Sequence, residues 1–158
     1  MKRFKKILLI ILIAAVLVSA VIGYFAVRRR GVYVGMSLEE FKERIPQDDY
    51  FEYISYVFFR NSMGGHVVAR FSDSYEITQY ECFDPWQIDT SDAAFARIKI
   101  GMSVEEVVSI VGIPSGSPTF GLSTLEFTSD SGTRYVICLT GEPTAFENGL
   151  TVIGITAE

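Results

Sequence analysis

The sequence predicts an α+β fold in which two tandem units, each a helix followed by a three-stranded antiparallel sheet, are preceded by one transmembrane helix. Three observations lead to this prediction: an internal repeat, a change from helical to strand periodicity after each copy of the repeat, and a long uncharged apolar run near the N-terminus. We expect an N-terminal anchor over residues 1–30, a first unit over 31–90 and a second over 91–158.

The repeat carries the signals of a helix start. Residues 34–41 read Val-Gly-Met-Ser-Leu-Glu-Glu-Phe, and residues 100–107 read Ile-Gly-Met-Ser-Val-Glu-Glu-Val. In each copy the serine is placed as an N-cap, the second glutamate can complete a capping box, and the methionine and last apolar residue have the spacing of a hydrophobic staple. The repeat therefore predicts helices over 37–45 and 103–111 that begin at Ser37 and Ser103.

Beyond each predicted helix the apolar pattern becomes that of strands, with Gly, Asn, Asp and Ser at the breaks. We expect each set of three strands to form a meander, and a short extra helix to precede the second copy over residues 91–97. The predicted strands are 50–60, 66–71 and 75–83 in the first unit, and 123–128, 133–139 and 150–156 in the second.

Residues 7–27 contain no charged side chain and are long enough to cross a bilayer core of about 30 Å. Four basic side chains precede this run and three follow it, so the positive-inside rule slightly favours a cytoplasmic N-terminus and an extracytoplasmic 31–158. A signal peptide cleaved after Ala20 is the alternative, but the apolar run continues beyond that position. The sequence therefore predicts a single-pass membrane protein whose residues 7–27 contact lipid.

Charge is distributed unevenly along the chain. Residues 1–30 hold seven of the 14 Lys and Arg and no Asp or Glu, which leaves 7 basic and 19 acidic side chains, a net charge of −12, in residues 31–158. This balance argues against nucleic-acid binding, which needs a basic surface. The acidic surface either attracts a basic partner or simply keeps the domain soluble.

Few residues point to catalysis. His66 is the single histidine, and no nucleophile motif accompanies it, so it is better explained as an exposed or hydrogen-bonded side chain at a strand end. Cys82 and Cys138, one in each unit, either pair across the units or serve as small buried side chains. We therefore expect no enzyme activity, no cofactor, no metal site and no small-molecule substrate.

Aromatic residues are concentrated in the first unit, where residues 31–90 hold 13 of the 21 in the chain. Both faces of the predicted strand over 50–60 are apolar, and helices packed on a single sheet bury only one face, so we expect the other to contact a partner. The alternative is a central strand whose second face is covered by the segment next to the anchor or by a second molecule. The candidate partner-binding residues are Asp49, Tyr50, Tyr53, Tyr56, Phe58 and Trp86.

The second copy of the repeat belongs to a longer pattern, which runs Phe95-x-x-Ile98-x-x-Gly101-Met102-Ser103-x-x-Glu106-Val107 and ends Gly112-x-Pro114. This pattern resembles the repeat signature of the β-lactamase-inhibitor-protein-like (BLIP-like) fold, which also marks the small lipoprotein of the outer-membrane assembly machine (SmpA/OmlA, BamE-like). The resemblance implies two helix-plus-sheet units joined in one curved sheet. The chain departs from it by having one Cys per unit in place of a disulfide in each, and no lipid-bearing Cys.

Together these observations predict a membrane-anchored, extracytoplasmic and non-catalytic module that binds another protein of the cell envelope through an aromatic sheet face. The resemblance implies an alternative, a proteinaceous inhibitor of a secreted or periplasmic hydrolase. It rests on Asp49-Tyr50-Phe51-x-Tyr53, which is similar to an acidic-aromatic stretch on the binding face of the inhibitor.

Overall fold

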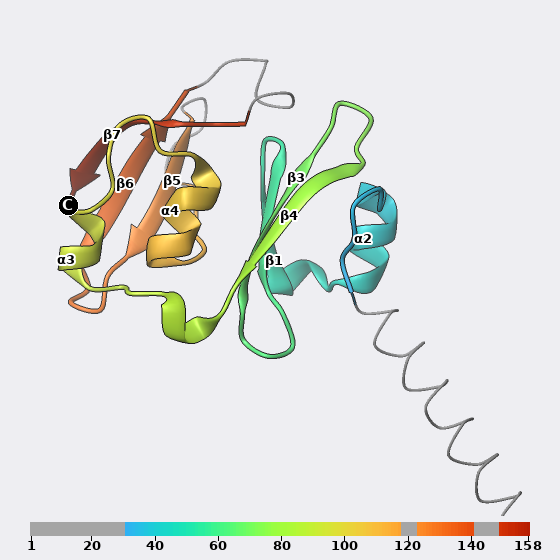
Figure 1. The fold of residues 1–158 in the computed structure, drawn as a ribbon, viewed down its shortest axis with the longest axis horizontal. Helices are drawn as coiled ribbons and strands as arrows, with labels where there is room; N and C mark the ends of the chain where they lie inside the picture. The colour runs from blue at the N-terminus through green and yellow to red at the C-terminus, as the bar shows by residue number, and fades with distance from the viewer. Residues whose placement is uncertain (1–30, 118–122, 141–148) are drawn as a thin grey trace, which may run out of the picture. The chain divides into compact units, whose positions relative to one another are not determined.

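A computed structural model of the chain describes residues 31–117, 123–140 and 149–158. Residues Tyr33–Glu158 form one compact unit (Figure 1). Its first half contains α2 (Leu38–Arg44), η1 (Gln47–Asp49), β1 (Tyr50–Tyr53), β2 (Tyr56–Arg60), β3 (His66–Phe71), β4 (Ile77–Phe83) and η2 (Pro85–Gln87). Its second half contains α3 (Asp92–Phe95), α4 (Val104–Val111), β5 (Thr124–Thr128), β6 (Arg134–Leu139) and β7 (Val152–Ala157).

The strands form one four-stranded antiparallel sheet, in the order β1-β2-β3-β4, and one three-stranded antiparallel sheet, in the order β5-β6-β7. The predicted fold class, with two equivalent three-stranded units, is therefore wrong. The stretch 50–60, predicted as one strand, turns back on itself so that Tyr53 lies opposite Tyr56. Ile54 makes this turn with a φ of +52°, although β-branched residues rarely adopt positive φ and such turns usually carry Gly or Asn. The turn therefore left no signal in the sequence.

The predicted transmembrane helix is also corrected, and with it the single-pass membrane localisation. No helix in the described part of the chain has the length and the apolar composition needed to cross a membrane. Residues 7–27, on which the prediction depended, lie outside the described residues. The predicted membrane anchor, cytoplasmic N-terminus and extracytoplasmic placement of 31–158 therefore have no supporting helix in the described residues.

Both predicted helix starts are confirmed. The Oγ atoms of Ser37 and Ser103 each accept a hydrogen bond from the backbone N–H three residues later, at 3.1 Å. The residues before each serine also pair in the same way with a later strand, because Gly35 N–H donates to the Ile77 carbonyl and Gly101 N–H donates to the Val152 carbonyl. The repeat thus sets both how each helix begins and how its first residues join a sheet.

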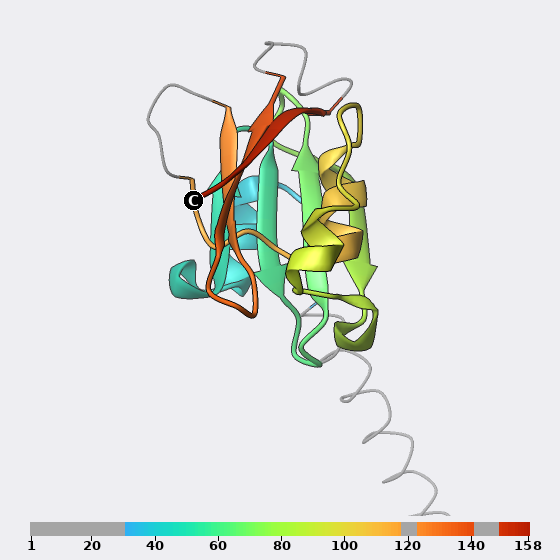
Figure 2. The same cartoon turned by 90° about the vertical axis from the view of Figure 1, so that its left-hand side faces the viewer.

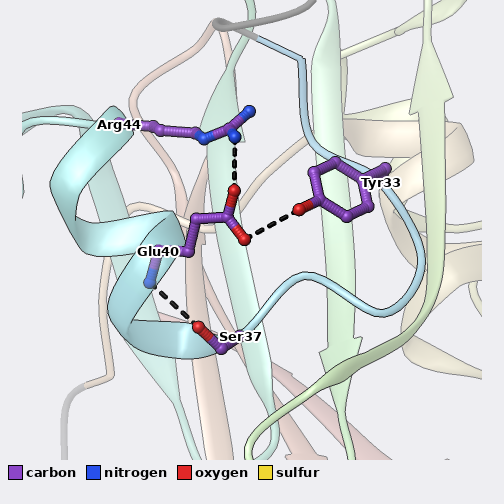
Figure 3. Close-up of polar contacts among 4 residues, drawn as sticks. All are labelled: Tyr33, Ser37, Glu40 and Arg44. Carbon is purple, nitrogen blue, oxygen red and sulfur yellow. Dashed lines mark hydrogen bonds and ion pairs between the residues drawn. The ribbon is translucent and has the colours of Figure 1, made fainter.

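The two helix starts differ in the use of their glutamates. The Glu106 Oε2 accepts from the Ser103 backbone N–H at 2.8 Å and completes a capping box. The Glu40 carboxylate instead accepts from the Tyr33 hydroxyl at 2.7 Å and from the Arg44 guanidinium (Figure 3). The Arg44 Cζ also lies 5.5 Å from the centre of the Tyr33 ring. In the first half, the glutamate therefore fastens the segment before the helix to its last turn.

Helix α2 covers one face of the four-stranded sheet, and α4 with the three-stranded sheet lies on the other side (Figures 1 and 2). Under α2, the fully buried Phe41 ring makes edge-on contacts with the rings of Tyr50, Phe59 and Phe71, at centroid distances of 5.2, 5.5 and 6.2 Å. This face of the sheet is a conventional helix-on-sheet core.

The opposite face is buried as well, by the second half of the chain. Tyr56, Phe58 and Val68 belong to one buried cluster that continues into α3, α4 and β5–β7. On the three-stranded sheet, Phe95 of α3 stacks on Tyr135 at 4.0 Å between ring centres. The expectation of an aromatic sheet face open to a partner is therefore wrong, because the two halves pack on each other.

Candidate functional site

The structure removes two of the six predicted partner-binding residues from the surface. Tyr56 is 0% exposed and Phe58 is 1% exposed, so neither can contact a partner. The Tyr56 hydroxyl accepts from the Leu150 backbone N–H at 3.1 Å and is hydrogen-bonded by Arg70. Burial raises the pKa of Tyr56 to about 12, and this residue acts as a polar link between the two halves.

Tyr53 also joins the halves. It is half-buried at the end of β1, where its hydroxyl hydrogen-bonds with the backbone of Thr124 and the side chain of Ser123. Burial raises its pKa despite these bonds. The placement of Tyr53 is therefore explained by the packing of β1 near the start of β5.

The remaining three predicted residues, Asp49, Tyr50 and Trp86, lie at one end of the four-stranded sheet. Antiparallel pairing brings the start of β1, the β2–β3 turn and the end of β4 to the same end, as Tyr50 opposite Phe59 and the next pairs show. Tyr50 is half-buried against Phe41, whereas Asp49 is exposed. Trp86 in η2 is 79% exposed.

The structure adds a residue that the sequence reasoning missed. Met63, in the β2–β3 turn, is 82% exposed, the highest fraction among the large apolar side chains described. A Cβ placed on Gly64 would lie 3.6 Å from the Pro85 side chain, and η2 lies beside this turn in both views (Figures 1 and 2). We call Met63, Pro85 and Trp86 the tip patch.

The turn that carries Met63 is held by the Asn61 side chain. The Asn61 Oδ1 accepts from the backbone N–H groups of Met63 and Gly65, at 3.0 and 2.8 Å, and its Nδ2 donates to the Cys82 Sγ at 3.2 Å. Both cysteines are free thiols, and Cys82 is exposed. Its pKa is raised, first by partial burial and then by the nearby Asp84 charge, and both effects disfavour the thiolate.

A second feature is a polar cleft of about 390 Å³ between β4 and the start of α4. On the sheet side, the Arg70 Nη2 donates to Gln79 at 2.9 Å, and the Gln79 Nε2 donates to Glu81 at 2.9 Å. The helix side contributes the first turn of α4. The lining residues are Arg70, Gln79, Glu81, Phe83, Ser103, Glu105, Glu106 and Ser109.

Glu105 is the unusual residue of this cleft. It is 8% exposed, and no described residue donates a hydrogen bond to its carboxylate or forms an ion pair with it. Its charge still reaches the interior, since it contributes to raising the pKa of Tyr56.

His66 borders a smaller hollow of about 260 Å³, but its ring is already engaged. The side chain is 6% exposed, and its Nδ1 accepts from the Ile113 backbone N–H at 3.0 Å. Burial, assisted by the Arg60 charge, lowers the pKa of His66. A neutral imidazole that accepts a backbone hydrogen bond is a structural link between β3 and the end of α4, in agreement with the hydrogen-bonded interpretation of this residue.

The arrangement of acidic and thiol groups gives no metal centre within residues 31–117, 123–140 and 149–158. No three of the described His, Cys, Asp and Glu side chains gather closely enough to hold an ion. The two features that remain as candidates for function are the tip patch and the polar cleft. Comparison of the chain with protein-family models, with curated proteins and with solved structures gave no match.

Proposed function

We propose that this protein is a non-catalytic module that binds another protein through the tip patch. The observation that carries the proposal is the exposure of Trp86 and Met63, 79% and 82%, at neighbouring turns of one sheet end. Tryptophan is usually well buried on average, and it is the residue type most enriched among those that dominate binding energy at protein interfaces.

The geometry of the turn supports the same conclusion. The three hydrogen bonds of the Asn61 side chain fix the turn that presents Met63, and Pro85 restricts the backbone next to Trp86. A patch that is already ordered loses less conformational entropy when a partner binds. Neither side chain fills the core, so core packing does not explain why a methionine and a tryptophan occupy these two positions.

Charge favours a particular kind of partner. Residues 31–158 carry a net charge of −12, and Asp49 and Asp84 lie at the same end of the sheet as the tip patch. A partner with an apolar centre and a basic rim would be steered toward this end and held there by complementary charge.

The first test compares partner capture by three baits made from the full chain. Trp86→Ala and Met63→Ala remove the tip patch, whereas Tyr75→Ala removes a 60% exposed aromatic from the β3–β4 turn at the other end of the sheet. We expect the first two to weaken capture about 30-fold, corresponding to about 2 kcal/mol, and to change the free energy of unfolding by less than about 0.5 kcal/mol. Equal capture by all three baits would rule out the tip patch.

The second test uses the fact that Trp86 is the single tryptophan in the chain. Its fluorescence therefore reports the tip patch alone. When the captured partner is added in purified form, the emission should move to shorter wavelength as the indole leaves water, and acrylamide quenching should fall. Saturable binding with an unchanged spectrum would place the contact elsewhere on the molecule.

A further inference from the structure

The polar cleft has an excess of negative charge that the described residues do not neutralise. The lining of this cleft, which has a volume of about 390 Å³, contains three carboxylates and one guanidinium. The carboxylates belong to Glu81, Glu105 and Glu106, and the guanidinium to Arg70. The Arg70 guanidinium already donates to Gln79 and is hydrogen-bonded to Tyr56. Helix α4 itself contributes two carboxylates and no cation to the cleft.

The other polar groups of the cleft have partners, except for the buried Arg70 Nε, which has none among the described residues. Glu106 accepts from the Ser103 backbone N–H at 2.8 Å, the Ser103 Oγ accepts from the Glu106 N–H, and the Ser109 Oγ donates to the Glu106 carbonyl at 2.6 Å. On the opposite side, Glu81 accepts from Gln79. Among the carboxylates of the cleft, that of Glu105, a residue 8% exposed, receives no hydrogen bond from the described residues.

We propose that this cleft receives an arginine side chain from the partner protein, with its guanidinium donating to Glu105 and a neighbouring carboxylate. The inference rests on the proposed protein-binding function and names the chemistry of one contact. A guanidinium has several N–H donors in a planar fork and can therefore serve two carboxylates that an ammonium point charge would serve less well. The half-buried Phe83 ring in the wall suits the flat face of the same group.

The dimensions of the cleft favour an organic cation over a metal ion. Its volume falls within the range of about 300–1,000 Å³ that is typical of ligand pockets. No three of the described acidic, His and Cys side chains come close enough to share a metal. A cleft of this size can instead admit an arginine side chain, whose charged end would meet the Glu105 carboxylate in the lining.

The test uses small probes and does not require the partner. The full chain, labelled with ¹⁵N, is titrated with N-acetyl-arginine amide and, separately, with N-acetyl-citrulline amide, which has nearly the same shape but no charge. We expect the arginine probe to shift amide resonances of β4 and of the first turn of α4 in a saturable manner, weakened by added salt, and the citrulline probe to leave them unchanged. Equal shifts from both probes, or shifts confined to other elements, would overturn the proposal.

A matched pair of variants identifies the carboxylate. Glu105→Gln removes the buried charge, and Glu39→Gln removes an exposed charge at the equivalent position in the first turn of α2. We expect Glu105→Gln to weaken the arginine probe about tenfold and Glu39→Gln to leave it unchanged. Equal affinity for the two variants would show that Glu105 does not bind the cation.

Stability separates a binding carboxylate from a structural one. If Glu105 serves to bind a partner and not to stabilise the fold, Glu105→Gln should have a urea midpoint equal to or higher than that of the wild type when no probe is present. The reason is that a neutral amide costs less to bury than a carboxylate. A lower midpoint together with unchanged probe binding would assign Glu105 to the fold and refute the inference. Loss of capture at the tip patch with probe binding retained would instead count against the proposed interface alone.

Discussion

Gly112→Ala is the change that should damage this structure most for its size. Gly112 ends α4 with a φ of +86° and a ψ of −168°, a backbone region open almost only to glycine. A Cβ at this position would lie 2.4 Å from the His66 Nδ1 and 2.6 Å from its Cε1. Since the His66 Nδ1 accepts from Ile113, the added methyl group also displaces a buried hydrogen bond.

The expected destabilisation can be built from three terms. The backbone conformation costs about 1–3 kcal/mol for a non-glycine residue, the steric overlap about 1–3 kcal/mol, and the lost hydrogen bond about 1 kcal/mol. Together they predict a loss of about 3–7 kcal/mol, a large share of the 5–15 kcal/mol that is typical of a folded domain. The urea-induced unfolding midpoint, followed by circular dichroism, measures this loss.

Gly132→Ala provides the control. Gly132 has the same φ of +86°, but nothing lies within 4 Å of its Cβ position, so we expect only the backbone cost of about 1–2 kcal/mol. In addition, replacing His66 by Ala in the Gly112→Ala background should recover part of the loss, because the clashing ring is gone. Equal destabilisation by Gly112→Ala and Gly132→Ala, with strict additivity in the double variant, would refute the reasoning.

Three further predictions concern buried polar groups. Tyr56→Phe should lower the free energy of unfolding by about 1–3 kcal/mol, because the Leu150 N–H and the Arg70 guanidinium lose their partner. Tyr80→Phe, which removes the hydroxyl of a 42% exposed tyrosine, is the control and should not lower it to this extent. Because the folded pKa of Tyr56 is raised from 10.0 to about 12, wild-type stability should fall as pH rises from 10 to 12, by at most about 2–3 kcal/mol, and Tyr56→Phe should lack this slope in urea midpoints. Because burial lowers the pKa of His66 below 6.5, stability should fall as pH drops through 6.5; an NMR titration of this single histidine that shows a raised pKa would contradict this.

Local signals in the sequence were sufficient to locate the helix starts. Ser37 and Ser103 act as N-caps because their hydroxyls lie one helical turn before a free N–H, a relation that depends only on neighbouring residues. The strand His66–Phe71 is likewise confirmed, since its apolar run is bounded by Gly64-Gly65 and Ser72. Such features require no knowledge of distant contacts.

Features that depend on long-range packing could not be read in this way. The apolar stripe of α4, Val104, Val107, Val108 and Val111, places Glu105 outside the stripe, yet packing of the helix against β3 and β4 buries it. Tyr56 and Phe58 were expected at the surface because nothing in the sequence indicates that the second half covers them. Trp86, a candidate partner-binding residue in the sequence, is 79% exposed, but its neighbour Met63 carries no sequence signal beyond lying in a turn.

The hydrogen bond between Leu150 and Tyr56 joins residues 94 positions apart. During synthesis, the apolar side of β2 and β3 leaves the ribosome long before the strands that will cover it exist. The apolar face of β2 and β3 therefore stays uncovered while the second half is synthesised. At about 5–20 residues per second, this synthesis takes several seconds. The packing of the two halves can accordingly be completed only after the second half has been made.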